Sequence, residues 1–198
     1  MTVKPFLLSL LSLVSIDKPD TEISQLGGWF VDYKAELSVN EAIERFENGS
    51  FSPSAGRIPN LGKVSGVVYS ATKIQNNRQD REYVLEYSYA PLDYITTFII
   101  KNGVVVRAHF TGDHAPLDLR FRKHRKSNIL INVNPGESIV LLTKIDSSSM
   151  ISLGIHLFTL DAYEDYIDDD TITLDFGRVN ARGYRNDSAC RCRHVYAD

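Results

Sequence analysis

The segment ITTFIIKNGVVVRAHF, residues 95–110, decides the fold class. Two runs of apolar, strand-forming residues flank Asn102 and Gly103. Asn-Gly between such runs predicts a β-hairpin, because a type I′ turn requires positive φ at both central positions. The segment therefore predicts two neighbouring antiparallel strands joined by a tight turn.

Strand patterns extend outward on both sides of this hairpin. Residues 82–89 alternate between two faces, one of which carries Tyr83, Leu85, Tyr87 and Tyr89, a period typical of a β-strand. The tetrapeptide NPGE at 134–137 has Pro and Gly where a type II turn requires them. Similar alternation predicts further strands at 28–34, 129–133, 139–145 and 151–157.

One helix pattern interrupts the strands. Ser38 and Glu41 form a capping box, and Gly49 follows where a helix commonly ends. Apolar residues lie between them at the spacing of one helix face: Val39, Ala42, Ile43 and Phe46. With roughly seven to nine short strands and so few helices, a parallel α/β sheet is excluded. The sequence predicts an all-β jelly-roll β-sandwich with one short N-terminal helix.

Composition excludes several functional classes. The 198 residues carry a net charge of -3, with 43% hydrophobic and 24% charged residues, as in one folded domain. The charge balance argues against nucleic-acid binding, so the basic run RFRKHRK at 120–126 is interpreted as a solvated face or a patch for acidic ligands. Two cysteines are too few for a disulfide scaffold or a four-ligand zinc site. No apolar run is long enough to span a membrane.

The N-terminus has the pattern of an export signal. Lys4 precedes an apolar segment at 6–16 whose length suits a signal-peptide core. A clear small-residue cleavage site is missing. We predict a signal peptide at residues 1–16; the alternative is a first buried strand or an apolar helix.

The C-terminus is predicted to lie outside the sandwich, with an acidic spacer and an Arg-rich disordered tail over residues 164–198. Seven acidic residues and no Lys or Arg lie between 161 and 175, and five Arg follow in the last 21 residues. Cys190, Cys192 and His194 supply too few ligands for a metal site, so a frayed tail is favoured.

The candidate ligand-binding residues lie in TGDHAPLDLRFRKH, residues 111–124. This segment leaves the 104–110 strand as a long connection, and loops often carry function. Arg offers a planar fork of donors and Asp offers paired acceptors, which suits the hydroxyl and carboxylate groups of sugars and sugar acids. The candidates are Asp113, Asp118, Arg120, Arg122 and His124.

Alternatives stay open for these residues. An Arg–Asp pair could instead pin the long loop to the sandwich, and the same side chains could serve both purposes. Asp113 and Asp118 could offer oxygen ligands to Ca²⁺, although no motif demands a metal or cofactor. The tyrosine face of residues 83–89 could stack on a sugar, but a place in the core is favoured. No catalytic signature is present, and we predict no enzymatic activity.

The order of these segments resembles a known family. It runs through WFVDY at 29–33, the capping-box helix, FSP at 51–53, YVLEYSYAPLDY at 83–94, TGDHAPLDLR at 111–120, His124, NPGES at 134–138 and IDSSS at 145–149. The combination resembles, over about residues 25–163, the type-2 extracellular domain of bacterial 7TMR-DISM receptors. These receptors carry seven transmembrane helices and diverse intracellular signalling modules.

The resemblance implies a jelly roll similar to carbohydrate-binding modules, located in the periplasm or on the extracytoplasmic face of the inner membrane. Its role would be to sense a carbohydrate-like ligand and pass the signal inward. The positions that match the family are Gly112, Asp113, Pro116, Arg120 and His124. Where the family's first transmembrane helix would begin, near 172–177, an Arg-rich segment follows that could not insert. We therefore predict a sensor domain that lacks its transmembrane and output modules.

Two other functions remain as alternatives to this ligand-sensing domain, whose protein partner would be a second copy or a receptor subunit. One is a structural or dimerisation domain without a ligand. The other is a polysaccharide-acting enzyme on a jelly-roll fold, which would need two carboxylates facing one cleft.

Overall fold

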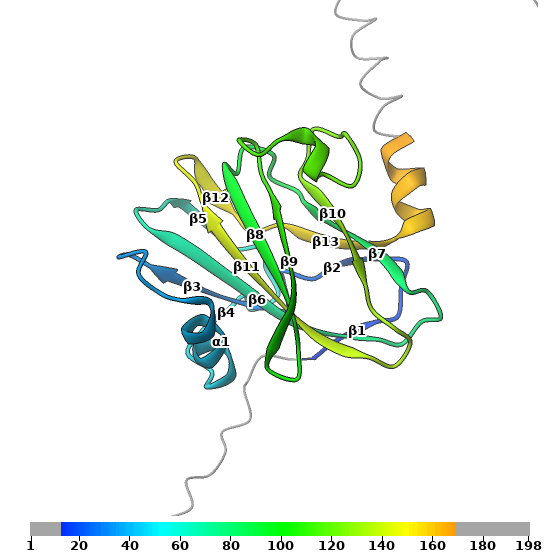
Figure 1. The fold of residues 1–198 in the computed structure, drawn as a ribbon, viewed down its shortest axis with the longest axis horizontal. Helices are drawn as coiled ribbons and strands as arrows, with labels where there is room; N and C mark the ends of the chain where they lie inside the picture. Colours follow the sequence, from blue (N-terminus) through cyan, green and yellow to red (C-terminus); the bar gives the residue numbers. More distant parts are fainter. Residues whose placement is uncertain (1–12, 169–198) are drawn as a thin grey trace, which may run out of the picture. The chain divides into compact units, whose positions relative to one another are not determined.

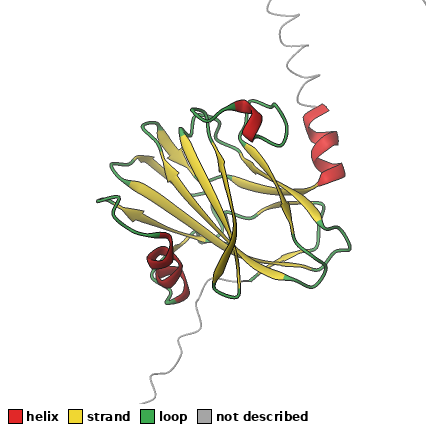
Figure 2. Ribbon diagram, viewed as in Figure 1, coloured by secondary structure: helices red, strands yellow, loops and turns green. Residues whose placement is uncertain are grey.

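The computed structural model describes residues 13–168, whose strands form two large sheets (Figure 1, Figure 2). The larger sheet has seven strands in the order β4-β3-β6-β11-β8-β9, with β1 paired to β6. Its strands are β1 (Val14–Ile16), β3 (Gly28–Asp32), β4 (Ser52–Pro53), β6 (Val67–Asn76), β8 (Tyr94–Lys101), β9 (Val104–Thr111) and β11 (Ser138–Asp146).

The smaller sheet has four strands in the order β10-β7-β13-β2. They are β2 (Asp20–Glu22), β7 (Glu82–Tyr87), β10 (Asn128–Asn132) and β13 (Ile155–Thr159); β5 (Asn60–Lys63) and β12 (Met150–Ser152) form a separate ribbon. Among the described strands, only the β1–β6 pair is parallel. The prediction of an all-β sandwich is confirmed.

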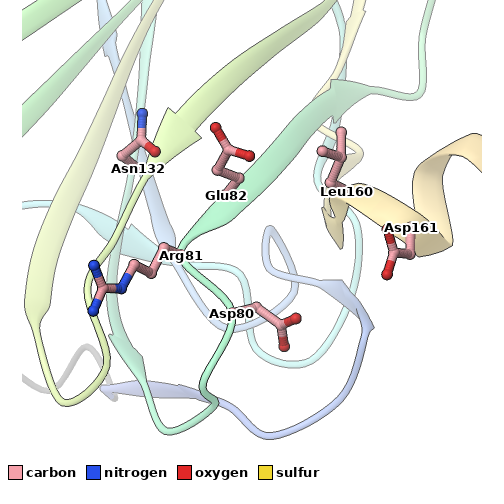
Figure 3. A pocket seen from close by; sticks show the side chains of 6 residues that line it. All are labelled: Asp80, Arg81, Glu82, Asn132, Leu160 and Asp161. Atoms are coloured by element: carbon pink, nitrogen blue, oxygen red, sulfur yellow. The ribbon is translucent and has the colours of Figure 1, made fainter.

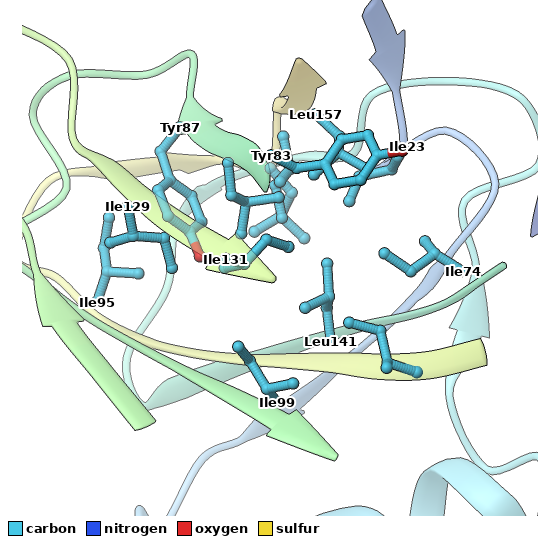
Figure 4. Close-up of a cluster of buried hydrophobic side chains, with 14 of the residues drawn as sticks. Ile23, Ile74, Tyr83, Tyr87, Ile95, Ile99, Ile129, Ile131, Leu141 and Leu157 are labelled. Atoms are coloured by element: carbon cyan, nitrogen blue, oxygen red, sulfur yellow. The ribbon is translucent and has the colours of Figure 1, made fainter. Parts of the chain in front are cut away.

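The apolar core lies between the two sheets (Figure 4). Ile74, Leu141 and Ile99 come from the larger sheet, and Tyr83 and Tyr87 come from the smaller one. Each fully buried aliphatic or aromatic side chain contributes about 1.5–3 kcal/mol to folding. Both tyrosines are fully buried, which confirms their place in the core.

The hydroxyl of Tyr87 is satisfied inside this core by the side chains of Thr97 and Thr143. Burial raises the pKa of Tyr87 to about 12, against the smaller effect of these hydrogen bonds. A polar atom in the core is therefore partnered and uncharged.

The hairpin predicted around Asn102 and Gly103 joins β8 to β9. Both residues have positive φ, 51° and 75°, as a type I′ turn requires. Strand β9 is an edge strand of the larger sheet, paired only with β8 among the described residues.

The NPGE turn connects the two sheets, because β10 belongs to the smaller and β11 to the larger. Gly136 has a φ of 75°, and the amide of Glu137 donates to the carbonyl of Asn134 at 2.9 Å. The carboxylate of Glu137 also lies 2.7 Å from Nζ of Lys101. A hydrogen bond from Lys101 is the largest influence that lowers the pKa of Glu137. The turn prediction is confirmed.

Helix α1 (Val39–Glu47) begins at the predicted capping box, in which the side chains of Ser38 and Glu41 each accept from the other's backbone amide. Ala42, Ile43 and Phe46 are buried. They pack with apolar side chains on the outer face of the larger sheet, away from the central core: Phe51, Val67, Tyr69, Ala71, Ile100 and Leu142.

Strand β1 overlaps the segment predicted as a signal peptide. Val14 and Ile16 are buried, and β1 pairs in register with β6. A leader cut after residue 16 would remove this strand from the sheet, so the boundary at 16 does not fit the sandwich. Residues 1–12 lie outside the described residues, and export itself stays a prediction. Strands β1 and β2 also precede residue 25, where the domain was expected to start.

The described chain ends in a helix at residues 160–168, which the sequence pattern did not predict. The remainder of the predicted spacer and tail, including Cys190 and Cys192, lies outside the described residues. Between residues 13 and 168, no helix is long and apolar enough to cross a membrane.

Candidate functional site

The loop between β9 and β10, residues 112–127, contains all five candidate side chains. It begins at Gly112, whose φ of +134° is rarely adopted by other residues. A Cβ here would lie 2.2 Å from the carbonyl oxygen of Asp93. The missing side chain therefore lets the loop start directly against the residues that lead into β8.

Backbone hydrogen bonds fasten the start of the loop. The amide of Asp113 donates to the carbonyl of Leu92 at 2.7 Å, and that of His114 donates to the carbonyl of Asp93 at 3.1 Å. The carboxylate of Asp93 accepts from the amide and hydroxyl of Ser148 at 2.7 and 2.8 Å. These two hydrogen bonds lower the pKa of Asp93, and the bond from the Ser148 amide has the larger effect. The APLDY, TGDH and IDSSS segments thus meet in one hydrogen-bonded cluster.

Arg120 ties the two ends of the loop together. Its side chain is buried, and Nη2 donates to the carbonyl of Gly112 at 2.9 Å. Nη1 donates to the carbonyls of His124 and Arg125. The guanidinium therefore pins the loop, as one of the two interpretations held, but its partners are backbone carbonyls and not an Asp.

Asn128, which the sequence did not single out, fastens the end of the loop. Its fully buried side chain accepts from the amide of Arg122 at 2.7 Å and donates to the carbonyls of Arg122 and Lys126 at 3.0 and 2.9 Å. A buried amide that replaces backbone pairing in this way gives the loop one conformation. No periodicity marks such a residue, because its partners lie in an irregular segment.

The other predicted site residues do not converge on one point. Asp118 lies on the surface, with an oxygen 2.9 Å from Nζ of Lys123. The guanidinium of Arg122 stacks over the ring of Phe121, with its carbon 4.1 Å from the ring centre. Asp113 is exposed.

His124 turns toward a buried carboxylate that sequence reasoning missed. Glu86 on β7 has a side chain only 2% exposed, with Oε1 at 3.1 Å from Nζ of Lys126 and Oε2 at 3.8 Å from Nδ1 of His124. The hydroxyl of Tyr163 donates to the same Oε2 at 3.2 Å. A buried carboxylate requires such partners, because desolvation of a lone charge is expensive.

A second ionic group continues across the smaller sheet. His156 on β13 is the cross-strand neighbour of Glu86 on one side and of Glu22 on the other. Its Nε2 lies 2.7 Å from Oε2 of Glu22, and its Nδ1 lies 3.3 Å from Oδ1 of Asp20. The hydrogen bond to Glu22 raises the pKa of His156, against burial. Burial would raise the pKa of Glu22, but hydrogen bonds from His156 and Ser24 lower it overall.

The described residues contain no group of three or more His, Cys, Asp or Glu that could hold a metal ion. Asp113 and Asp118, which could have offered oxygens to Ca²⁺, are not joined by others into such a group.

An exposed aromatic cluster lies where the loop begins, and the sequence did not predict it. Tyr94 and Phe110 stack with ring centres 6.1 Å apart and planes 17° apart. The ring of His114 meets Tyr94 edge-on at 5.5 Å. Tyr94 and Phe110 are 45% and 43% exposed. Tyr94 and Phe110 lie on the same face of the sheet only when Thr96 is paired with Phe110. The sequence could therefore have indicated this cluster only if the strand pairing were already known.

An open pocket of about 450 Å³ lies at the opposite end of β10 from the loop (Figure 3). It is lined by Asp80, Arg81, Glu82, Asn132, Leu160 and Asp161. Asp80 also pairs with Arg78 at 2.7 Å. Three carboxylates around one pocket disfavour an acidic ligand there.

The 112–127 loop and the residues that fasten it, Arg120 and Asn128, lie within one segment that matches a known protein family. The sequence matches the family described as 7TMR-DISM extracellular 2 over residues 27–159. The chain belongs to this family. No curated relative matches the chain.

Membership of the 7TMR-DISM extracellular 2 family makes this an extracellular sensor domain of a receptor type and implies placement outside the cytoplasm. The matched residues extend from β3 to the end of β13 and include the loop and its hydrogen-bonded cluster. Several motif residues that carried the resemblance, among them Gly112, Arg120 and Asp93, hold loops in place in this structure.

Proposed function

We propose that this 7TMR-DISM extracellular 2 domain is a non-enzymatic, extracytoplasmic sensor that binds a carbohydrate-like ligand at the 112–127 loop. The observation that carries the proposal is that some side chains of the loop fix its backbone while others are exposed to solvent. Arg120 holds its backbone from inside, whereas Asp113 is exposed and hydrogen-bonds through its backbone only, among the described residues. A fixed loop with an outward carboxylate is preorganised for hydroxyl groups.

The predicted site residues take different parts in this proposal. Asp113 accepts from ligand hydroxyls, and Asp118 and Arg122 form the polar rim of the site. Arg120 is a positioning residue, because both terminal nitrogens of its guanidinium donate to backbone carbonyls, while its buried Nε has no hydrogen-bond partner within the described residues. His124 positions the end of the loop through its approach to Glu86.

Signal transfer in this proposal is a shift between two states of a receptor. A ligand changes such an equilibrium only by as much as it prefers one state over the other. The domain supplies the binding step, and a second copy or a receptor subunit would read the result.

The test is isothermal titration calorimetry and thermal melting of the full chain with a panel of neutral oligosaccharides and uronic acids. We expect saturable binding that Asp113→Asn weakens about tenfold, the loss expected for one hydrogen bond to a charged group. Glu44→Gln, on the exposed side of α1, is the matched control and should bind like the wild type. A cooperatively melting protein that binds no carbohydrate would refute the proposal. Repeating the titrations with Ca²⁺ and with EDTA tests the calcium alternative.

One observation favours a polysaccharide-acting enzyme as the second candidate: Asp80, Glu82 and Asp161 line a single pocket. Reducing-end release from polysaccharides, lost in Glu82→Gln, would support it. Carbohydrate binding without turnover would instead support the sensor.

A further inference from the structure

The strand pairing of β8 and β9 places a stacked pair of exposed aromatic rings beside the loop. Thr96 lies opposite Phe110 in the register, and Tyr94 lies two residues from Thr96 on the same face. This diagonal is within reach of aromatic side chains. The two rings are therefore nearly parallel and stacked, and each residue is close to half exposed.

The face that carries these rings is the outer face of the larger sheet. Ile95 and Ile99 point into the central core, so Tyr94, Thr96 and Phe98 point outward. Helix α1 covers part of this face, where Phe98 joins the apolar cluster beneath it. Tyr94 and Phe110 are not part of that cluster, so helix α1 does not cover them.

Polar groups border the aromatic pair. Strand β11 places Asp146 directly opposite Tyr94 and Lys144 directly opposite Thr96, on the same outer face. Asp146 is exposed, and neither side chain has a hydrogen bond or ion pair within the described residues. On the other side, His114 contacts Tyr94 edge-on. The rings are thus flanked by a carboxylate, an ammonium group and an imidazole with free hydrogen-bonding capacity.

The backbone beneath the rings is held rigidly. A Cβ at Gly112 would lie 3.1 Å from the Cα of Tyr94, so the loop lies close against it. Asp93, the preceding residue, is anchored to Ser148 through its carboxylate. A rigid support lowers the entropic cost of ligand binding.

We propose that Tyr94 and Phe110 form a stacking platform for a neutral pyranose, with Asp146 and Lys144 binding its hydroxyl groups. This inference rests on the proposed function and assigns it a subsite on the sheet face. The electron-rich ring faces attract the C–H groups of a sugar ring, which carry partial positive charge. Asp146, directly opposite Tyr94, disfavours a carboxylate on the ligand beside that ring, so we expect a neutral sugar to bind in preference to a uronic acid.

Calorimetric titration of the full chain tests the platform, with neutral gluco-, xylo- and manno-oligosaccharides and galacturonate oligomers as probes. Tyr94→Ala and Phe110→Ala should each weaken neutral-sugar binding about tenfold, a typical loss for one aromatic contact. Tyr94→Trp should retain binding, and Asp146→Asn should weaken it several-fold. Tyr33→Ala is the matched control, because Tyr33 is 76% exposed and makes no ring contact in the described chain. Melting curves check that every variant is folded.

The possible results separate the platform from the proposed function. Sugar binding that survives Tyr94→Ala and Phe110→Ala but is lost in Asp113→Asn overturns the platform and leaves the sensor function standing. A preference for galacturonate oligomers overturns the neutral-sugar assignment. Absence of any carbohydrate binding overturns both. If Phe110→Ala instead abolishes a concentration-dependent dimer and no sugar binds, the face is a self-association surface and the platform is wrong.

Discussion

The outer faces of the two sheets contrast sharply in how their side chains are partnered. On the smaller sheet, a cross-strand row of Asn128, Glu86, His156 and Glu22 runs over all four strands. Each of these side chains has a hydrogen bond or an oppositely charged group. On the larger sheet, the part of the outer face beyond α1 carries Tyr94, Phe110 and Asp146, whose side chains make no hydrogen bond or ion pair among the described residues.

This difference separates residues that stabilise the fold from residues that are free to bind. A buried charge such as Glu86 is tolerated only because Lys126 and Tyr163 compensate it. Half-exposed rings contribute little to folding and remain accessible. The 112–127 loop joins the two faces, because it begins against Tyr94 and ends with Lys126 on Glu86.

The largest loss of stability is expected for a variant on the outer face of the smaller sheet, where the side chains are partnered (the partnered face). Glu86→Ala should lower the free energy of unfolding by about 3–5 kcal/mol, because it removes the buried carboxylate that Lys126 and Tyr163 contact. Glu82→Ala is the control on the same strand, since Glu82 is exposed. Urea denaturation measures both. A Glu86 variant as stable as the Glu82 variant would show that this network does not stabilise the sandwich.

Loosening the 112–127 loop, which joins the two faces, should lower the free energy of unfolding by somewhat less. Arg120→Ala leaves three carbonyls without their donor and should destabilise the domain by about 2–4 kcal/mol. Amide hydrogen exchange should accelerate within 112–127 first, and the exposed Arg57→Ala should change neither quantity. Unchanged exchange in this loop would contradict the pinning role of Arg120.

The ionic pair of the partnered face should make stability depend on pH. The raised pKa of His156 means that its contribution is complete below its ordinary value of 6.5 and is lost as pH rises through the folded-state pKa. The lowered pKa of Glu22 means that its contribution is present above 4.5 and is lost as pH falls through the folded-state pKa. Asp20 also favours the charged form of His156, and Glu86 faces His156 across the β7–β13 pair.

We therefore expect the wild type to exceed His156→Gln in stability most between pH 4.5 and 6.5, by on the order of 1 kcal/mol for this partly buried pair. Denaturation series at several pH values measure the difference. In the Glu22→Gln background the difference should lose this dependence; if the dependence persists there, another group is responsible.

The smallest stability effects are expected on the unpartnered face. Tyr94→Ala and Phe110→Ala should each change the free energy of unfolding by less than about 1 kcal/mol, because half of each side chain is already in water. Phe46→Ala, on the buried face of α1 and on the same side of the sheet, should cost about 3–5 kcal/mol. Thermal melting compares the three. A large loss at Tyr94 or Phe110 would mean that these rings belong to the core.

Local features of the fold could be predicted to within a residue or two. The capping box at Ser38 and the positive φ at Asn102 depend on neighbouring residues and on backbone sterics alone. The helix at 160–168 was missed because its segment was interpreted from its acidic composition. The residues of strand β1 were included in the predicted signal peptide, because a short apolar run suits either a leader or a buried strand.

The candidate site could be predicted only in part. The loop was found because its polar residues follow a strand, but the direction of Arg120 could not be read from the pattern. Glu86 alternates with Tyr87 and Leu85 and was placed on the face away from the core, which gave no sign that this face is also covered. The Tyr94–Phe110 pair was missed because neither residue is unusual in its own strand.

The strand-rich class, the hairpin, helix α1 and the family could be inferred from the residues alone, because side-chain periodicity and turn sterics act over a few residues. The burial of polar groups and the exposure of aromatic rings became clear only from the packed fold. Glu86 meets partners 40 and 77 residues away along the chain, and Tyr94 meets Phe110 through strand register. Burial and accessibility result from these distant contacts, and the free energy of a charge or a ring depends on what the fold places beside it.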